Sequence, residues 1–239
     1  MRELHPGSEL AGYRIESVER ADDRAAVLLA RDPRDEREVA LHIVGEPPGS
    51  LSTTRFLERA RRLGTVEHPH LLGVYEAQTL DGRAVAVAQA PPGRRLDSVI
   101  AERRLTPEEA LRIVLQVASA VDALEEAGAE PPPLTAAQIW IDGDGNAVLD
   151  GLDAVTAPRP PSSSAALAGL LTEMTGRLPA PFCAIVTRAR EGAYLSTGRL
   201  AKDLRAAREA AAARRRRIAT AVLLIASAIA FLVLLVSLA

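Results

Sequence analysis

Short apolar runs separated by polar turns dominate the first 90 residues of the chain. Runs in which apolar and polar side chains alternate predict β-strands, because successive side chains of a strand point to opposite faces. Between the third and the fourth run, a threonine N-cap signal and the helical spacing of apolar residues predict a helix over Thr53–Leu63. The five predicted strands are Tyr13–Val18, Ala25–Ala30, Glu38–Val44, Leu71–Glu76 and Ala84–Gln89.

From about residue 91 the apolar positions follow the period of helices. Thr106-Pro107-Glu108-Glu109 has the capping residue, the proline and the acidic residues of a helix start, and this helix is predicted to end at Gly128. A low-complexity linker follows at 156–164. The other predicted elements are strands at Gln138–Ile141 and Ala147–Leu149, and helices at Ala165–Thr175, Ala180–Arg190 and Arg199–Ala213.

The segment 218–239 contains no charged side chain. As a helix it would be about 33 Å long, enough to cross a bilayer core of about 30 Å, so the sequence predicts a transmembrane helix. Basic residues at the start of a span stay on the cytoplasmic side, which predicts a cytoplasmic N-terminal domain and a C-terminus outside the cell. We expect no external sensor domain after Ala239. The predicted membrane-anchoring residues are Arg214, Arg215, Arg216 and Arg217.

Charge is unevenly distributed along the chain. The net charge is −2, and residues 199–217 carry +6, so residues 1–198 carry −8. A basic segment next to a membrane and an acidic domain beyond it are typical of a membrane-tethered protein. Because the arginines adjoin the predicted span, we expect no nucleic-acid partner. The single Cys183 excludes an intramolecular disulfide and a cysteine-rich metal site, and we predict no metal site of any kind.

Several segments carry a more specific pattern: GYRIESVERADDRAAVLLARD at 12–32, REVALHIV at 37–44, the tetrad Glu67-His68-Pro69-His70, RLTPEEALRIVLQVASAVDALEEAG at 104–128, and ALAGLLTEMTGRLP at 166–179. In this order they resemble a bacterial serine/threonine protein kinase domain, and the resemblance covers residues 9–206. It implies an α+β, two-lobed protein-kinase-like fold with a shortened C-terminal lobe, plus one transmembrane α-helix.

The resemblance also implies a domain organisation. The kinase-like N-lobe, a five-stranded sheet with one helix, is expected at 9–90, and a shortened kinase-like C-lobe at 91–206. A basic juxtamembrane segment is expected at 207–217, before the transmembrane helix at 218–239.

Protein kinases need a phosphate-holding lysine, a helix glutamate that orients it, a catalytic aspartate, and an asparagine and a second aspartate that hold magnesium. The phosphate-covering loop of this chain lacks glycine, and a one-residue shift would bring Asp150 to the position of the second aspartate. The five positions fall, in that order, on the degenerate equivalents His42, Arg59, Pro133, Gln138 and Gly151. Weak cofactor-binding candidates are His42, Ala88, Asp150 and Asp153.

Because these positions lack the family's residues, we predict a catalytically dead homologue with weak or absent ATP binding. Its expected role is that of a membrane-anchored cytosolic pseudokinase, a scaffold or regulatory module for a cytosolic or membrane signalling protein. Two alternatives remain open: a nucleotide or small-molecule sensor that uses the inter-lobe cleft, and a divergent serine/threonine protein kinase with weak activity. Candidate contact surfaces are Arg55, Arg59, Arg61 and Arg62, and the segment Pro91–Leu96.

Overall fold

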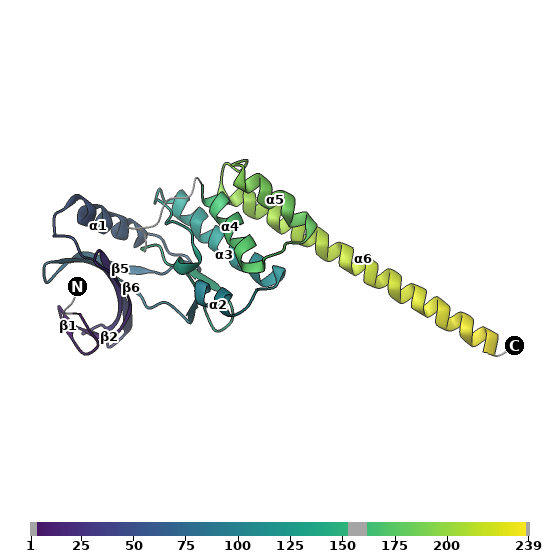
Figure 1. The fold of residues 1–239 in the computed structure, drawn as a ribbon, viewed down its shortest axis with the longest axis horizontal. Helices are drawn as coiled ribbons and strands as arrows, with labels where there is room; N and C mark the ends of the chain where they lie inside the picture. Colours follow the sequence, from purple (N-terminus) through teal and green to yellow (C-terminus); the bar gives the residue numbers. More distant parts are fainter. Residues whose placement is uncertain (1–3, 153–161, 238–239) are drawn as a thin grey trace.

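The computed structural model describes residues 4–152 and 162–237, with side chains described up to residue 227. Two lobes follow one another along the chain, a curled sheet with one helix and a mainly helical part (Figure 1). The N-terminal lobe holds β1 (Glu9–Leu10), β2 (Tyr13–Ala21), β3 (Ala25–Arg31), β4 (Glu38–Val44), α1 (Leu51–Leu63), β5 (Val74–Leu80) and β6 (Arg83–Gln89).

The sheet of the N-terminal lobe is antiparallel throughout, in the order β1-β2-β3-β4-β6-β5. Strand β6 of this sheet is buried on both of its faces. Ala84, Ala86 and Ala88 belong to the core that continues into the C-terminal lobe, whereas Val85 and Val87 belong to a second core inside the curled sheet. Since the side chains of a strand alternate, one strand serves both cores.

Helix α1 packs on β5 and β6 through Phe56, Ala60 and Leu63. The side chain of Ser50 caps its first turn by accepting a hydrogen bond from the backbone N–H of Thr53, 3.3 Å away. The helix therefore begins at Leu51, earlier than the predicted start at Thr53, because the capping residue is the serine and not a threonine.

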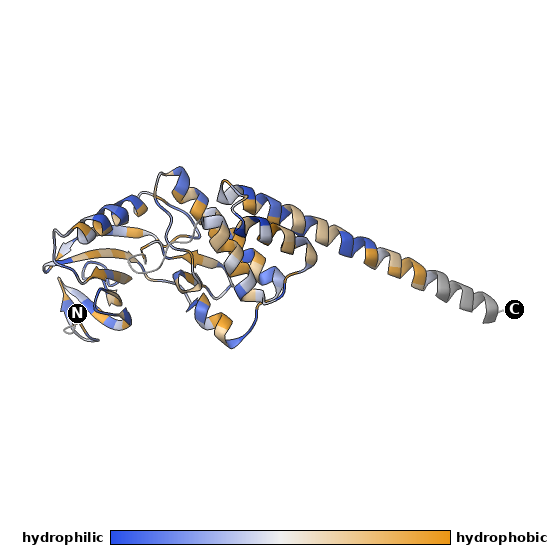
Figure 2. Ribbon diagram, turned by 45° about the horizontal axis from the view of Figure 1, so that its top comes forward, coloured by the Kyte–Doolittle hydropathy of each residue, from blue (hydrophilic) through white to orange (hydrophobic). Residues whose placement is uncertain are grey.

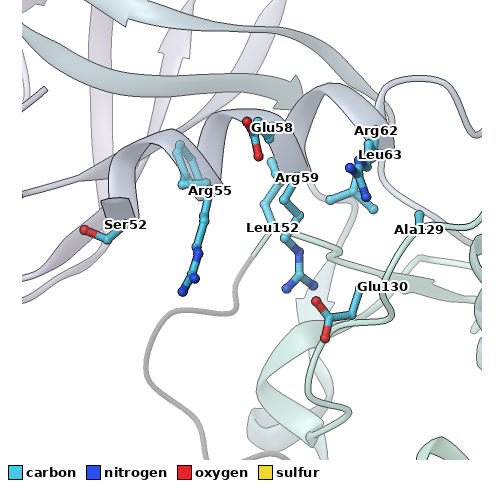
Figure 3. Close-up of a pocket in the computed structure, with 10 residues that line it drawn as sticks. Ser52, Arg55, Glu58, Arg59, Arg62, Leu63, Ala129, Glu130 and Leu152 are labelled. Carbon is cyan, nitrogen blue, oxygen red and sulfur yellow. The ribbon is translucent and has the colours of Figure 1, made fainter. Parts of the chain in front are cut away.

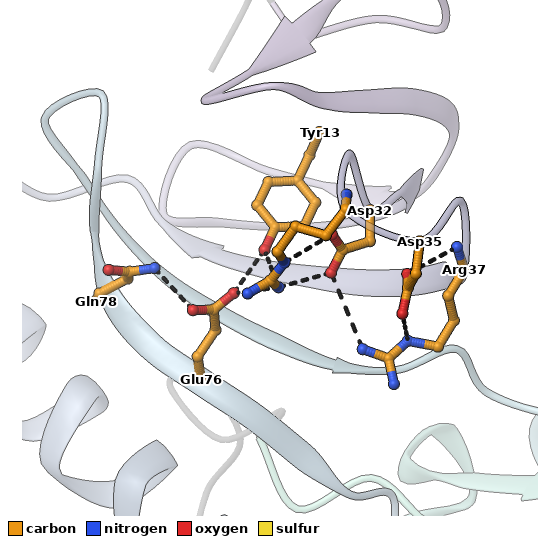
Figure 4. A network of polar contacts seen from close by, with 7 residues as sticks. Tyr13, Asp32, Asp35, Arg37, Glu76 and Gln78 are labelled. Atoms are coloured by element: carbon orange, nitrogen blue, oxygen red, sulfur yellow. Dashed lines mark hydrogen bonds and ion pairs between the residues drawn. The ribbon is translucent and has the colours of Figure 1, made fainter.

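A polar network joins three strands of the N-terminal lobe around the buried carboxylate of Asp32 (Figure 4). Arg34 donates to Asp32 from its backbone N–H and its Nε, both at 2.9 Å. The same guanidinium donates to the hydroxyl of Tyr13 and to Glu76, at 3.0 and 2.8 Å. The Arg34 bonds lower the pKa of Asp32 to about 2, and burial together with Glu76 raises the pKa of Tyr13.

The C-terminal lobe is built around the long helix α3. Thr106 and Glu109 form a reciprocal capping box at its first turn, and its buried face packs against α4 and α6. A small sheet in the order β7-β8-β9 lies beside it. The elements of this lobe are β7 (Arg94–Arg95), α2 (Leu96–Glu102), α3 (Pro107–Glu126), η1 (Ala136–Gln138), β8 (Ile139–Ile141), β9 (Ala147–Leu149), α4 (Ser163–Thr175), α5 (Ala180–Arg190) and α6 (Thr197–Ser237).

The segment between α1 and β5 ties the two lobes together. Leu149 at the end of β9 donates its backbone N–H to the carbonyl of His70 and accepts from the N–H of Leu72, each at 2.9 Å. The ring of His68 hydrogen-bonds the hydroxyl of Ser119 on α3 at 3.0 Å, and burial together with His70 lowers the pKa of His68. These contacts fix where β9 ends relative to the N-terminal sheet.

Helix α6 runs 41 residues and leaves the body of the molecule (Figure 1). In the part of α6 with described side chains, the basic turn is followed by an apolar stretch (Figure 2), and its large exposed apolar residues are Ile218, Val222, Leu223, Leu224 and Ile225. Over the described residues, no helix combines the length and apolarity needed to cross a membrane. The predicted span at 218–239 is therefore not confirmed, and the side chains of 228–239 lie outside those described.

Most predicted elements occur within three residues of their expected bounds, but three details need correction. The N-terminal sheet has six strands instead of five, because the two-residue β1 is too short for a period to show. The fourth predicted strand starts at Val74 and not at Leu71, since Leu71 forms an isolated bridge with Leu149. The helix predicted from Arg199 starts at Thr197 and continues to Ser237.

Candidate functional site

His42 lies in the middle of β4, at the junction of the two lobes. It pairs with Val27 of β3 and Ala86 of β6, which fixes its backbone in the centre of the sheet. The residue is 4% exposed, and its Nε2 has no hydrogen-bond partner among the described residues. The carboxylate of Asp150 lies close by, with its Oδ2 3.7 Å from Nε2.

Asp150 is the first residue after β9, and its position is held from two sides. Its backbone N–H donates to the carbonyl of Gln138 at 2.7 Å, and its Oδ1 accepts from the N–H of Leu152 at 2.9 Å. The other carboxylate oxygen is then the one that faces His42. The structure thus places Asp150, which a one-residue shift of the alignment brings to the position of the second aspartate, at the junction of the lobes. The other candidate, Asp153, lies outside the described residues.

Arg59 connects α1 to the residue that follows Asp150. Its guanidinium donates to the carbonyl oxygen of Gly151 at 3.1 Å. Gly151 packs tightly, since an added Cβ would lie 3.1 Å from a methyl group of Leu63. A cation on α1 therefore holds the backbone beside Asp150, and the neighbouring Glu58 is exposed at the edge of a pocket on the same helix (Figure 3).

The proline segment leads into a closed turn. Pro132 and Pro133 are buried, and proline offers neither a side-chain base nor a backbone donor. The Oε1 of Gln138 accepts from both the backbone N–H and the hydroxyl of Thr135, and Gln138 is 5% exposed. Its amide oxygen is therefore engaged within this turn.

The turn between β2 and β3 closes on itself through Asp22. Its Oδ1 accepts from the backbone N–H groups of Arg24 and Ala25, at 2.7 and 2.8 Å. These bonds lower the pKa of Asp22, so the carboxylate is charged at neutral pH. The two amides that a phosphate-covering loop would offer to a ligand are already used.

The connection between the lobes follows β6. Ala88 is fully buried and pairs with Ala40 and Val74, so it contributes to the shared core. Pro91 and Pro92 come next and lack backbone donors. Gly93 then adopts φ +68°, and an added Cβ would lie 2.1 Å from the carbonyl oxygen of Ile141. This approach joins the connection to β8.

No protein-family model matches the chain. The kinase domain of Mycobacterium tuberculosis PknI, a crystal structure, superposes with a TM-score of 0.72 at 19% identity, covering 85% of this chain and 99% of that one. A double mutant of the same domain gives 0.73 at 20% identity, with 85% and 98% covered. The chain has a protein-kinase-like fold.

Sequence relatives agree with the kinase-like fold. Serine/threonine-protein kinase PknJ of M. tuberculosis is 30% identical over 128 residues, 53% of this chain and 22% of that protein. Serine/threonine-protein kinase PknE of the same species is 28% identical over 150 residues, 62% of this chain and 26% of that protein. The matched stretches thus span about a quarter of these relatives. The chain is a kinase-like protein related to serine/threonine kinases.

These comparisons correct one prediction. The expectation that the chain is not an enzyme is wrong, because the curated relatives and the solved neighbours alike are protein kinases, and they point to a kinase. The substitutions at His42, Arg59 and Pro133 were read as loss of activity. That inference rested on the joint loss of the family's residues, and it did not foresee that Asp150, next to Gly151, faces His42.

The kinase-like fold implies a magnesium ion, and the residues at the junction fit one held by a single carboxylate. Mg²⁺ in nucleotide sites is bound through one or two carboxylates together with phosphate oxygens. Asp150 has one oxygen engaged by Leu152 and the other directed to the junction. Within 4–152 and 162–237, no three histidine, cysteine or acidic residues gather in a way that could hold a metal without such a ligand.

Proposed function

We propose that the chain is a divergent serine/threonine protein kinase that binds a magnesium nucleotide weakly between its lobes and transfers the terminal phosphoryl group slowly. The observation that carries the proposal is the fixed Asp150 carboxylate facing His42, 3.7 Å away, at the junction of a kinase-like fold. The kinase relatives support the same reaction class.

Phosphoryl transfer makes few covalent demands on the protein, because its transition state is loose and catalysis is mostly positioning and charge neutralisation. A magnesium ion bound with the nucleotide would supply most of that charge, and Asp150 would hold it. His42 would add a positive charge when protonated, and its position in the central strand keeps it beside Asp150. Pro133 offers no group to accept the proton of the substrate hydroxyl, so that proton would leave to solvent.

We expect the nucleotide to bind weakly, because backbone donors that would contact it are either engaged in other hydrogen bonds or absent. The amides of Arg24 and Ala25 are taken by Asp22, and Pro91 and Pro92 give no donors to an adenine ring. Each lost hydrogen bond to a ligand costs roughly 1 kcal/mol, or about fivefold in affinity. We therefore propose a dissociation constant for ATP well above that of an ordinary kinase.

A membrane-proximal role completes the proposal. The exposed apolar residues of α6, Val222 and Leu223 among them, directly follow the arginines 214–217. An apolar helix surface of this kind is stable where lipid covers it. We propose that this end of α6 inserts into the membrane, with the lobes at 9–90 and 91–206 facing a cytosolic or membrane signalling protein. Extraction of membranes with alkaline carbonate should leave the chain in the membrane fraction, and release of the chain would contradict insertion.

Thermal unfolding of the chain with ATP and magnesium tests nucleotide binding. A ligand at ten times its dissociation constant stabilises the folded state by about 1.4 kcal/mol, so 10 mM ATP with magnesium should raise the melting temperature measurably even if the dissociation constant is about 1 mM. ATP with EDTA, and magnesium alone, serve as controls and should raise it much less. An unchanged melting temperature at 10 mM magnesium ATP would contradict the proposal.

A further inference from the structure

A second candidate site lies beside α1. A pocket of about 510 Å³ opens there between α1, the residues after α3 and Leu152 (Figure 3). It is separate from the pair His42 and Asp150, neither of which lines it. Three arginines of one helix line this pocket, at positions 55, 59 and 62.

The three arginines occupy one helix face, because residues three and four apart lie above one another. They span about 10 Å along the axis. Like charges at these spacings destabilise a helix slightly, and Glu58, three residues after Arg55 and four before Arg62, offsets only part of that cost. A ligand with a compact negative charge would reverse that cost.

Two of the three cations have no partner of their own. Arg55 and Arg62 are exposed, and neither side chain makes a hydrogen bond or an ion pair with another residue that the structure describes. Arg59 between them is held by the carbonyl of Gly151, and in Figure 3 the carboxylate of Glu130 points toward it. The pocket therefore has one fixed cation between two available ones.

Part of the remaining lining is apolar, next to the polar side chains of Ser52, Glu58 and Glu130. Phe56, Leu63 and Leu152 are 6%, 1% and 4% exposed and contribute to its lining, so their contacts with the core keep them in place. A ligand that fits both parts carries an anionic group next to an apolar one. Arginine forms two parallel hydrogen bonds to a phosphate or carboxylate, and a phosphorylated side chain brings close to two negative charges at pH 7.

Other anionic macromolecules fit less well. Residues 1–198 carry a net charge of −8, which opposes a long polyanion such as nucleic acid. The end of α6 lies at the opposite end of the molecule from α1, so a membrane reached by α6 would not meet this pocket (Figure 1). A concave site with an apolar floor suits a peptide chain better than a lipid surface.

We propose that the pocket of Arg55, Arg59 and Arg62 binds a phosphorylated serine or threonine of a partner protein, with an apolar neighbour of that residue on the floor formed by Phe56, Leu63 and Leu152. The site does not depend on the proposed nucleotide chemistry. Since Arg59 also holds Gly151, the bound peptide would contact the segment that carries Asp150.

Binding of a fluorescent peptide library to the full chain tests the proposal. Each peptide has one central phosphoserine or phosphothreonine with a leucine on either side in randomised flanks, and an unphosphorylated copy serves for comparison. We expect the phosphorylated peptides to bind at least tenfold more tightly. The double variant Arg55→Ala/Arg62→Ala should lose that difference, and Arg55→Lys/Arg62→Lys should keep only part of it, because lysine lacks the planar fork.

Arg61→Ala is the matched control. It removes one positive charge from the same helix, against two in the double variant, and Arg61 donates to the carbonyl of Ala77 and does not line the pocket. We expect less than a twofold change. Equal losses in Arg61→Ala and the double variant, equal binding of both peptide forms, or no binding at all would overturn the site. Binding to phosphatidylserine vesicles that depends on Arg55 and Arg62 would overturn it in favour of a lipid surface. Circular dichroism melting of each variant shows whether it is folded.

Discussion

The imidazole of His42 and the carboxylate of Asp150 face each other at the junction of the two lobes, with Nε2 and Oδ2 3.7 Å apart. They come from β4 and from the end of β9, which are more than 100 residues apart in the sequence. The distance is too long for a hydrogen bond, so the two groups interact through charge when His42 is protonated. The proposed nucleotide site depends on this pair.

Asp150→Asn should abolish the stabilisation by magnesium ATP. The amide keeps the size of the side chain and can still accept from Leu152, but it removes the negative charge that a magnesium ion requires. Asp144→Asn is the matched control, because Asp144 is exposed in the turn between β8 and β9. The shift in melting temperature with magnesium ATP measures both, and an equal shift in the two variants would remove Asp150 from the site.

His42→Lys should strengthen nucleotide binding. Lysine is charged at neutral pH and longer than histidine, so it can reach both Asp150 and a phosphate oxygen. We expect roughly tenfold tighter binding of magnesium ATP, which corresponds to about 1.4 kcal/mol. His42→Gln, which stays polar without a charge, is the comparison in titration calorimetry. Identical affinities of the two variants would show that charge at this position does not matter.

Asp32→Asn should destabilise the N-terminal lobe in a pH-dependent way. The pKa of Asp32 falls from 3.8 to about 2 on folding, so its contribution is complete above about pH 5 and is lost as the pH falls toward 2. At pH 7 the difference corresponds to about 2 kcal/mol. Urea denaturation should show this loss at pH 7 and a smaller one near pH 3. Asp23→Asn, at an exposed carboxylate of the β2–β3 turn, should change little at either pH, and a loss that does not depend on pH would contradict the charge argument.

Gly93→Ala should destabilise the connection between the lobes far more than Gly82→Ala. Both glycines have positive φ, +68° and +73°, so both alanines carry a similar backbone strain of about 1 kcal/mol. Only at Gly93 would the new Cβ meet a backbone atom, the oxygen of Ile141 at 2.1 Å. The urea midpoint of Gly82→Ala measures the backbone strain alone. The further decrease of the midpoint in Gly93→Ala measures the contact with Ile141. Equal midpoints would mean that β7 and β8 can move apart without cost.

Much of this fold is predictable from the sequence because its elements are locally encoded. The alternation Ala84 to Ala88 and the capping residues Thr106 and Glu109 each determine structure within a few residues. The elements that were missed, β1, β7, α2 and η1, are short, and β1 exists only because Glu9 and Leu10 pair with β2. Such pairing is a property of the assembled lobe.

The site was predictable only in part, for a related reason. His42 and Asp150 were both candidates, but residue spacing alone left the choice between Asp150 and Gly151 open. The contacts that decide the position of Asp150, to Gln138 and Leu152, are formed by the fold around it. The arginine-rich face of α1 was predicted as a contact surface that includes Arg61. The pocket was not predicted, because its lining requires Leu152 to come from the other lobe.

The central claim is slow phosphoryl transfer that depends on Asp150, and a single-turnover assay tests it most directly. The purified chain, in excess over γ-labelled ATP with magnesium, is incubated with a basic protein substrate, and labelled protein is counted over hours. We predict slow incorporation on serine or threonine that requires magnesium and is absent in Asp150→Asn. Incorporation by the unaltered chain that never exceeds that of Asp150→Asn would contradict the account.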